Sequence, residues 1–488
     1  MDFNRTQLTD LFTGLRHEKA KYINILHKIK TLIALCNDHK LILNQNEKIM
    51  LTSSPRIIFE SINFTHPILK ILLEFLEKTE RQINGDRFFI NALVCLIDQI
   101  SILLDNGVKS KVISDLLKDI SNIKCDEISN KKERELVGGI ENMKVSEDAF
   151  TLSDNIKEII KGVIGDDHVS DLLVESIEAT RSFSVEKIRV FKVGTGSFED
   201  SYATNGMIVD KTPEGNVKCL KNTSVGLFNC PLDICRTELK GTLVFNTHQE
   251  LLDYSIKETE SIKKLVDSLN VNVLIVCGNI NEQFMDFVNH RNILVLRTFN
   301  KYDLIRICDL VGGTIYNTFG PVKMKGHVGE IGVFEDGGKF FTKIVSARED
   351  GDKCMNVRTI VLKHSVKEVL DETERKINYV LNCLNSKKSY DMQKPATNFV
   401  VSGDDFTSNV ISYIKRKSSS SSSDAITSAL CKSLANLEDV KMVLSDKAKV
   451  MGYAFSFLAT ILEIDDYLVA KLDRLDVKPR DNPNWDED

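Results

Sequence analysis

The run Gly241-Thr242-Leu243-Val244-Phe245 predicts a short buried strand and opens the most strongly patterned part of the chain, residues 241–319. Thr247-His248-Gln249-Glu250 follows it with the Thr-x-x-Glu spacing of a capping box, which predicts a helix from there to about Leu269. Apolar runs at 271–276 and 293–296 then alternate with amphipathic segments. This alternation is typical of parallel strands joined by helical crossovers, so a compact α/β domain is expected here.

The predicted helix after Thr247 carries an apolar face that we expect to pack on the sheet. Its members are Leu251, Leu252, Tyr254, Ile256, Ile262, Leu265 and Leu269.

Composition bounds the class of protein. The chain has 488 residues, 42% apolar and 27% charged, with a net charge of -6, so it has room for two or three ordinary domains and no basic excess for nucleic acid. The most apolar helix candidate, 88–104, contains Asp98 and predicts a core helix rather than a membrane span. The 11 cysteines form no C-x-x-C pair, so we expect no metal site. The polar start 1–4 is unlike a signal peptide, and a cytoplasmic location is expected.

The two ends of the chain differ from its middle. Residues 1–124 and 425–472 show helical periodicity, whereas strands are predicted at 188–193, 206–209, 340–345 and 357–362. This nested order predicts that the ends form one helical domain into which the middle is inserted.

Several segments of the chain resemble the group II chaperonin family, to which the cytosolic chaperonin of eukaryotes belongs. They are Asn205–Val209, Asn229–Asp233, Gly241–Leu252, Asn272–Gly313, Thr359–Lys363, Leu370–Arg375 and the tail Asn484–Asp488. The resemblance extends over nearly the whole chain and is strongest from about 186 to 375.

The resemblance implies a multi-domain α and α/β fold. A helical equatorial domain would come from both termini, a hinge-like intermediate domain would follow on each side, and an α/β apical domain would be inserted in the middle. The expected boundaries are equatorial 1–124, intermediate 125–187, apical 188–345 with a helical protrusion at about 230–265, intermediate 346–378, equatorial 379–477 and an acidic tail 478–488.

The family also implies a function: a subunit of a hetero-oligomeric double ring that assists ATP-dependent folding of client proteins. The expected partners are seven paralogous subunits in each ring and unfolded clients, with no nucleic acid and no membrane. ATP and Mg²⁺ are the cofactors expected for the assembled complex.

The nucleotide motifs of the family are degraded in this chain. Phosphate loops need glycines for close backbone approach, and the metal and attacking water need carboxylates. Only Gly85, Asp86 and Gly403 remain as nucleotide-binding candidates, and Ser53-Ser54 stands where the family has an Asn-Asp pair. The position of the family's catalytic aspartate is held by Tyr379, a poor general base at neutral pH. We therefore expect no catalytic residue, little or no hydrolysis by this subunit, and a structural or client-binding role.

The helix at 281–290 supplies the client-binding candidates, because the corresponding helix of the family lines the client-facing cleft. The candidates are Phe284, Met285, Phe287 and Val288, most of which could equally pack on the sheet.

Two alternatives stay open at this stage. One is a conventional subunit that binds and hydrolyses ATP, with its motifs in a different register. The other is a free-standing nucleotide-dependent α/β enzyme, which would need a phosphate loop and a catalytic cluster within residues 190–345.

Overall fold

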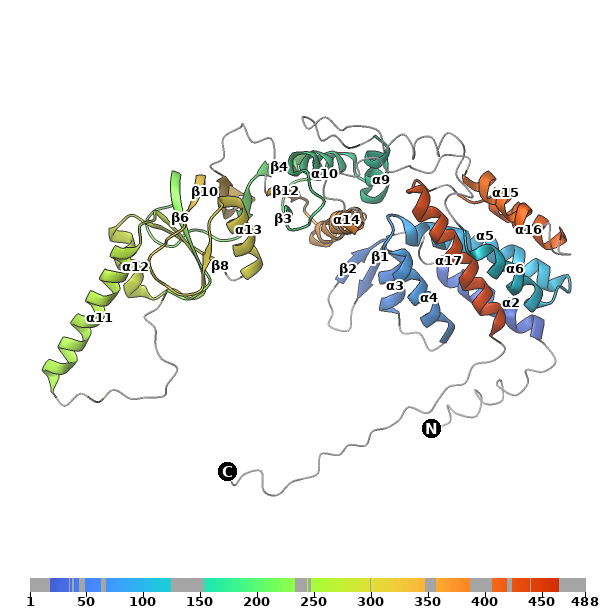
Figure 1. Cartoon of the computed structure of the whole chain (residues 1–488), viewed down its shortest axis with the longest axis horizontal. Coiled ribbons are helices and arrows are strands. Elements are labelled where there is room, and N and C mark those ends of the chain that lie inside the picture. Colours follow the sequence, from blue (N-terminus) through green and yellow to red (C-terminus); the bar gives the residue numbers. More distant parts are fainter. Residues whose placement is uncertain are drawn as a thin grey trace, which may run out of the picture.

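The computed structural model describes residues 18–34, 36, 39–43, 49–62, 67–123, 152, 154–232, 244, 247–298, 300–346, 357–386, 406–418, 424–438 and 440–464. These residues form three bodies that follow one another along the long axis (Figure 1). We call them the helical body, the middle body and the sheet body, and most of the buried apolar residues fall into clusters that each lie mainly within one body. A small cluster with Phe191 and Phe341 joins the middle body to the sheet body.

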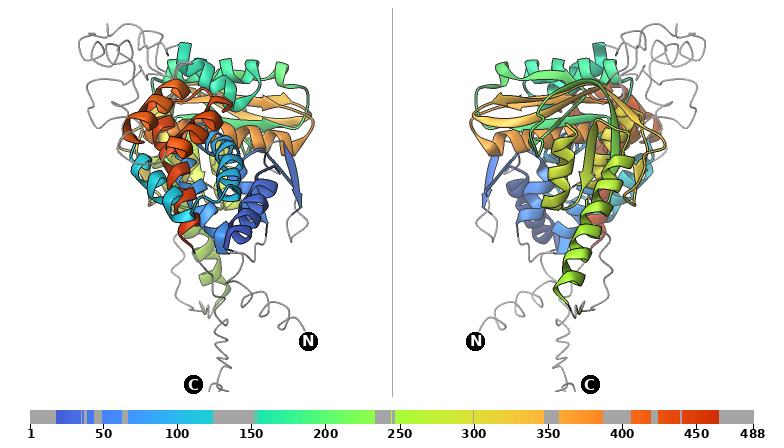
Figure 2. Two further views of the ribbon diagram at one scale, coloured as in Figure 1. Left: turned by 90° about the vertical axis from the view of Figure 1, so that its right-hand side faces the viewer. Right: turned by 90° about the vertical axis from the view of Figure 1, so that its left-hand side faces the viewer.

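The helical body takes its elements from both parts of the chain. They are α2 (Glu18–Ala34), β1 (Lys40–Leu43), β2 (Ile49–Thr52), α3 (Pro55–Ser61), α4 (Pro67–Thr79), α5 (Gly85–Asp105), α6 (Ser110–Ser121), α15 (Phe406–Ser418), α16 (Asp424–Ala435) and α17 (Leu444–Glu463). One core joins buried residues of 26–120 with buried residues of 406–462. Phe88 and Phe406 meet edge to face in it, with ring centroids 6.1 Å apart. In the left view of Figure 2, the red C-terminal helices lie against the blue N-terminal ones.

Helix α5 runs through the centre of this body. Within the described part of the chain, it is the one helix long and apolar enough to cross a membrane, but 61% of its apolar window is buried inside the protein. This burial agrees with the prediction of a core helix, because a membrane span would turn that surface to lipid.

The middle body joins two separate stretches of the chain. Its elements are α9 (Asp154–Ile164), α10 (Asp167–Thr180), β3 (Ile188–Val193), η1 (Phe198–Asp200), β4 (Tyr202–Asn205), β12 (Arg358–Lys363) and α14 (Lys367–Ser386). In its sheet, β12 is central, parallel to β3 and antiparallel to β4. The buried residues of α9, α10 and α14 share one cluster with this sheet.

The sheet body contains a mixed sheet with the strand order β5-β11-β10-β6-β7-β8, and β9 pairs with β6. Its elements are β5 (Met207–Val209), β6 (Leu220–Phe228), α11 (His248–Ser268), β7 (Val273–Cys277), α12 (Glu282–His290), β8 (Leu294–Thr298), α13 (Lys301–Val311), β9 (Ile315–Tyr316), β10 (Gly326–Asp336) and β11 (Lys339–Ser346). Helix α13 covers one face of the sheet, while α11 and α12 contribute to the core on the other face.

Much of the predicted α/β pattern is confirmed. Strands β7 and β8 are parallel to β6 and to each other, and helices α12 and α13 lie where amphipathic segments predicted them. Thr247 caps α11, since its hydroxyl accepts a hydrogen bond from the Glu250 amide at 3.4 Å. Helix α13 ends at Gly312, which has a left-handed backbone.

Two parts of the opening prediction need correction. Four of the five residues 241–245 lie outside the described residues, and the described one, Val244, is 80% exposed rather than buried. The apolar face of α11 is also largely exposed, because the helix extends past the sheet (Figure 1). Only Ile262 and Val266 of α11 are buried, whereas Leu252 and Ile256 lie in solvent.

The sheets also divide the chain differently from the expected boundaries. Strand β3, expected to begin the apical domain at 188, pairs with β12 in the separate sheet of the middle body. Helix α14 runs without a break through the expected boundary at 378. Strands β1, β2, β4, β6 and β10 were not predicted at all, and two of them, β6 and β10, stand at the centre of the large sheet.

Candidate functional site

Gly85 lies at the entrance to α5, where the preceding loop 79–84 turns back on itself. Asn84 has a left-handed backbone, and the Gly85 amide donates to the Gln82 carbonyl at 2.9 Å. A Cβ atom on Gly85 would lie 2.2 Å from the Thr79 carbonyl oxygen, which is far inside contact distance. Glycine is therefore required here by the turn itself, independently of any ligand.

Asp86 follows in the first turn of α5 and is 9% exposed. Its carboxylate accepts a hydrogen bond from the Arg87 amide at 2.8 Å. Burial raises the pKa of Asp86 from 3.8 to about 6, and the neighbouring Glu80 carboxylate acts in the same direction. The side chain is still mainly ionised at neutral pH, so it is the one carboxylate of the predicted set that could face a cation.

Tyr379 of α14 reaches the same loop from the middle body. Its hydroxyl donates to the Gln82 carbonyl at 2.7 Å and accepts from the Asn84 amide at 3.2 Å. Burial, followed by the nearby Asp86 carboxylate, raises the pKa of the phenol well above its ordinary value of 10. The phenol is thus a protonated hydrogen-bonding group in this arrangement and cannot serve as a general base.

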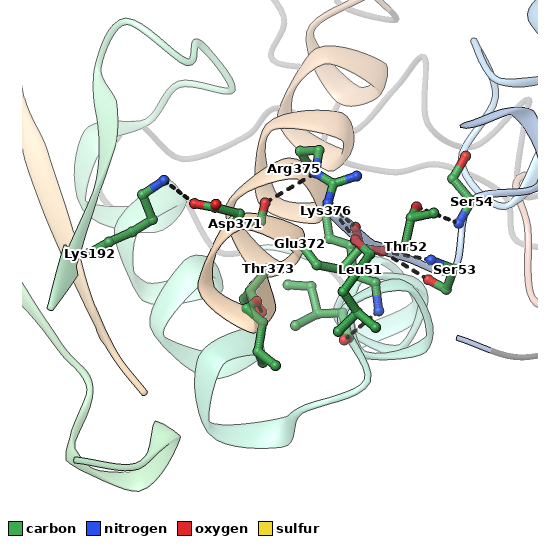
Figure 3. A network of polar contacts seen from close by, with 12 residues as sticks. Leu51, Thr52, Ser53, Ser54, Lys192, Asp371, Glu372, Thr373, Arg375 and Lys376 are labelled. Atoms are coloured by element: carbon green, nitrogen blue, oxygen red, sulfur yellow. Dashed lines mark hydrogen bonds and ion pairs between the residues drawn. The ribbon is translucent and has the colours of Figure 1, made fainter. Parts of the chain in front are cut away.

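Ser53 and Ser54, which occupy the expected Asn-Asp positions, lie between β2 and α3. The Glu372 carboxylate of α14 accepts from the Ser53 amide at 3.0 Å and from the Ser53 hydroxyl at 3.1 Å. Arg375 pairs with Glu372 at 3.1 Å and donates to the Leu51 carbonyl at 2.5 Å. Figure 3 shows these side chains of α14 facing the end of β2. Ser53 therefore has a partner within the chain.

Sequence reasoning missed the roles of Glu372 and Arg375. The available signal was their i, i+3 spacing on a helix, which places a carboxylate beside a guanidinium on one face. Nothing in the local sequence indicated that this face would meet Leu51 and Ser53, more than 300 residues earlier in the chain.

Of the three nucleotide-binding candidates, Gly85 and Asp86 lie among the described residues. A site for ATP with Mg²⁺ needs glycine amides around phosphate and fixed carboxylates around the metal. Gly85 is required by the turn, the Tyr379 phenol is hydrogen-bonded to the same turn, and Asp86 has the Glu80 carboxylate as an acidic neighbour. In the described part of the chain, no group of three His, Cys, Asp or Glu side chains could hold a metal ion. Gly403 lies outside the described residues.

The client-binding candidates separate into two pairs on α12. Phe284 is 1% exposed and Val288 is 0% exposed, and both belong to the core between α12 and the sheet. Phe284 stacks edge to face on Phe319, with centroids 5.0 Å apart. Met285 and Phe287 are only partly buried. In this conformation, Phe284 and Val288 are core residues, and only Met285 and Phe287 retain surface for a partner.

Comparison with known proteins identifies the family. The model of the TCP-1/cpn60 chaperonin family matches residues 38–390. The chain belongs to this family. It is 33% identical to T-complex protein 1 subunit theta of Encephalitozoon cuniculi over 504 residues, which cover 100% of both chains.

Other chaperonin subunits match over a smaller part. The chain is 27% identical to the probable T-complex protein 1 subunit theta of Schizosaccharomyces pombe, over 71% of this chain and 64% of that protein. It is 25% identical to the human T-complex protein 1 subunit theta, over 76% of this chain and 69% of the human one. The chain thus resembles theta subunits, spanning about two thirds of the Schizosaccharomyces pombe and human proteins and the full length of the Encephalitozoon cuniculi one.

Proposed function

We propose that this chain is a subunit of a hetero-oligomeric cytosolic chaperonin that takes part in ATP-dependent folding of client proteins without hydrolysing ATP itself. Family membership supports the first part, and the observation that carries the second is the bonded phenol of Tyr379 at the entrance to α5. In this proposal, ATP and Mg²⁺ act in the neighbouring subunits of the complex.

The three bodies support a domain assignment as part of this proposal. The helical body would be the equatorial domain, the middle body the intermediate domain, and the sheet body the apical domain with α11 as its protrusion. Relative to the expected boundaries, residues 188–205 and the end of α14, 379–386, would move to the intermediate domain, because β3, β4 and α14 share the sheet or the core of the middle body. The part of the client surface that falls on α12 would be formed by Met285 and Phe287.

Assembly is tested by tagging the chain in its own cells and purifying it under native conditions. The expected result is a megadalton particle that contains paralogous chaperonin subunits. A tagged chain that elutes as a monomer or dimer, with nucleotide-dependent activity of its own, would instead support a free-standing enzyme.

Hydrolysis is tested by single turnover in particles whose other subunits have lost their catalytic aspartates. We expect no phosphate release above background from a particle in which only this subunit is unaltered. A matched particle in which one partner keeps its catalytic aspartate gives the positive control. Phosphate release from the first particle at the rate of the second would identify a conventional ATP-hydrolysing subunit.

A further inference from the structure

One face of α14 carries four residues that all contact the helical body. Glu372, Arg375, Tyr379 and Cys383 follow one another at i, i+3, i+7 and i+11, which places them within one stripe along the helix. The Cys383 thiol adds a contact to the Glu80 carbonyl at 3.6 Å, beyond the contacts of Tyr379. We call this set the α14 stripe.

The stripe binds main-chain groups of two loops. At one end, Glu372 accepts a hydrogen bond from the Ser53 amide, and Arg375 donates one to the Leu51 carbonyl. At the other end, the Tyr379 hydroxyl donates to the Gln82 carbonyl and accepts from the Asn84 amide. These are the two loops, 51–54 and 80–86, on which the expected nucleotide motifs fall, so the amides of Ser53 and Asn84 are already used within the chain.

Other described residues also join the two bodies. Ile83 and Val443, from loops of the helical body, are buried in the cluster of the middle body. Lys441 pairs with Glu158 at 2.6 Å, but both side chains are more than half exposed, and such surface pairs contribute little. Relative motion of two bodies of one chain is the default expectation unless their interface is large and hydrophobic.

We propose that the α14 stripe is a nucleotide-independent latch that keeps the middle body docked on the helical body by occupying the main chain of both loops. This inference rests on the proposed function only for the identity of the two loops. The latch holds equally whether or not the chain assembles with the expected partners. Glu372 is buried and paired with Arg375, so both ends of the stripe use partly buried hydrogen bonds that water does not readily replace.

Hydrogen exchange of the purified complex tests the latch, read in the peptides of this subunit that contain Ser53 and Asn84. In the wild type, both amides should be protected without nucleotide and should keep the same protection when Mg-ATP is added. Tyr379→Phe removes only the hydroxyl, and we expect exchange at Asn84 to rise by roughly tenfold. Because the stripe acts as one unit, exchange at Ser53 should rise as well, although Tyr379 does not contact it.

Two further variants complete the test. Glu372→Met, which keeps the length of the side chain but has no oxygen to accept from Ser53, should reproduce the effect from the other end of the stripe, with exchange rising at Ser53 and also at Asn84. Tyr202→Phe, in β4 of the same body, should change neither peptide. An effect confined to the loop next to each substitution would show two independent contacts and overturn the latch.

Nucleotide provides the second criterion. A wild-type complex in which Mg-ATP changes the protection of both loops would also overturn the proposal. If the single-turnover particle shows no hydrolysis, that result would contradict the latch and leave the proposed function standing. Failure of the proposed function would instead be seen as phosphate release in the single-turnover assay or as absence of the chain from the complex.

Discussion

Replacing Asp86 by asparagine is expected to stabilise this protein at neutral pH and to leave it nearly unchanged in acid. The carboxyl is buried in the first turn of α5, and its pKa rises from 3.8 to about 6 in the folded state. A raised carboxyl pKa means that the folded state binds the proton more tightly than the unfolded state. The free energy of unfolding therefore falls as pH increases through the window from about 4 to about 6.

The size of the effect follows from the shift. A difference of about 2 pKa units corresponds to about 3 kcal/mol at high pH, and about 2 kcal/mol of this develops between about pH 4.5 and pH 7.5. Asparagine keeps a side-chain oxygen for the Arg87 amide but carries no charge. The difference between variant and wild type should thus grow by about 2 kcal/mol over that range.

Urea denaturation of the full-length chain at both pH values measures this difference, and subtraction cancels the other ionisable groups. Asp105→Asn, at the exposed far end of the same helix, is the matched control. Its free energy of unfolding relative to wild type should differ by no more than about 0.5 kcal/mol between the two pH values. An Asp86→Asn variant that is equally stable relative to wild type at both pH values would refute the argument. Destabilisation at pH 7.5 would show instead that the charge is required by a partner.

Two further predictions concern the turn before α5 and the core of the sheet body. Gly85→Ala should destabilise the chain in urea by more than about 2 kcal/mol, because its Cβ would collide with a backbone carbonyl, whereas Gly194→Ala, which meets no atom within 4 Å, should be tolerated within about 0.5 kcal/mol. Equal effects at the two glycines would contradict the close approach. Phe284→Ala should lower the free energy of unfolding by about 3–5 kcal/mol, because it leaves a cavity in the core. Phe287→Ala, measured by the same urea denaturation, should lower it distinctly less. A larger loss for Phe287→Ala would contradict the core position of Phe284 and return it to the client-binding surface.

The local sequence was sufficient to predict an element where apolar residues recur regularly along that element. Strands β7 and β8 are uninterrupted apolar runs, and α12 and α13 alternate with them, so the parallel part of the sheet could be predicted. Strand β6 was missed because its first half, Leu220-Lys221-Asn222-Thr223-Ser224, is mainly polar, and only its second half is buried. Strand β10 also mixes buried and exposed residues along its length. It is a strand because β6 and β11 pair with its main chain on both sides, which its own sequence does not show.

The amphipathic face of α11 shows the opposite error. Periodicity correctly predicted a helix and its cap at Thr247, but it could not tell whether a sheet lies beneath each turn. Only the last turns of α11 reach the core. In its earlier turns, the apolar periodicity indicates a helix but not that its apolar face is buried. Burial depends on which neighbours the fold supplies, and the local sequence does not contain that information.

At the candidate site, the amino-acid sequence by itself determined which groups are present: the phenol of Tyr379, the hydroxyls of Ser53 and Ser54, and Gly85 before the carboxyl of Asp86. Only the tertiary structure decided what these groups do. Tyr379 and Asn84 are 295 residues apart in the chain, and Glu372 and Ser53 are 319 apart. Hydrogen bonds act over about 3 Å, so their partners are set by how the helical and middle bodies dock, which no local pattern specifies.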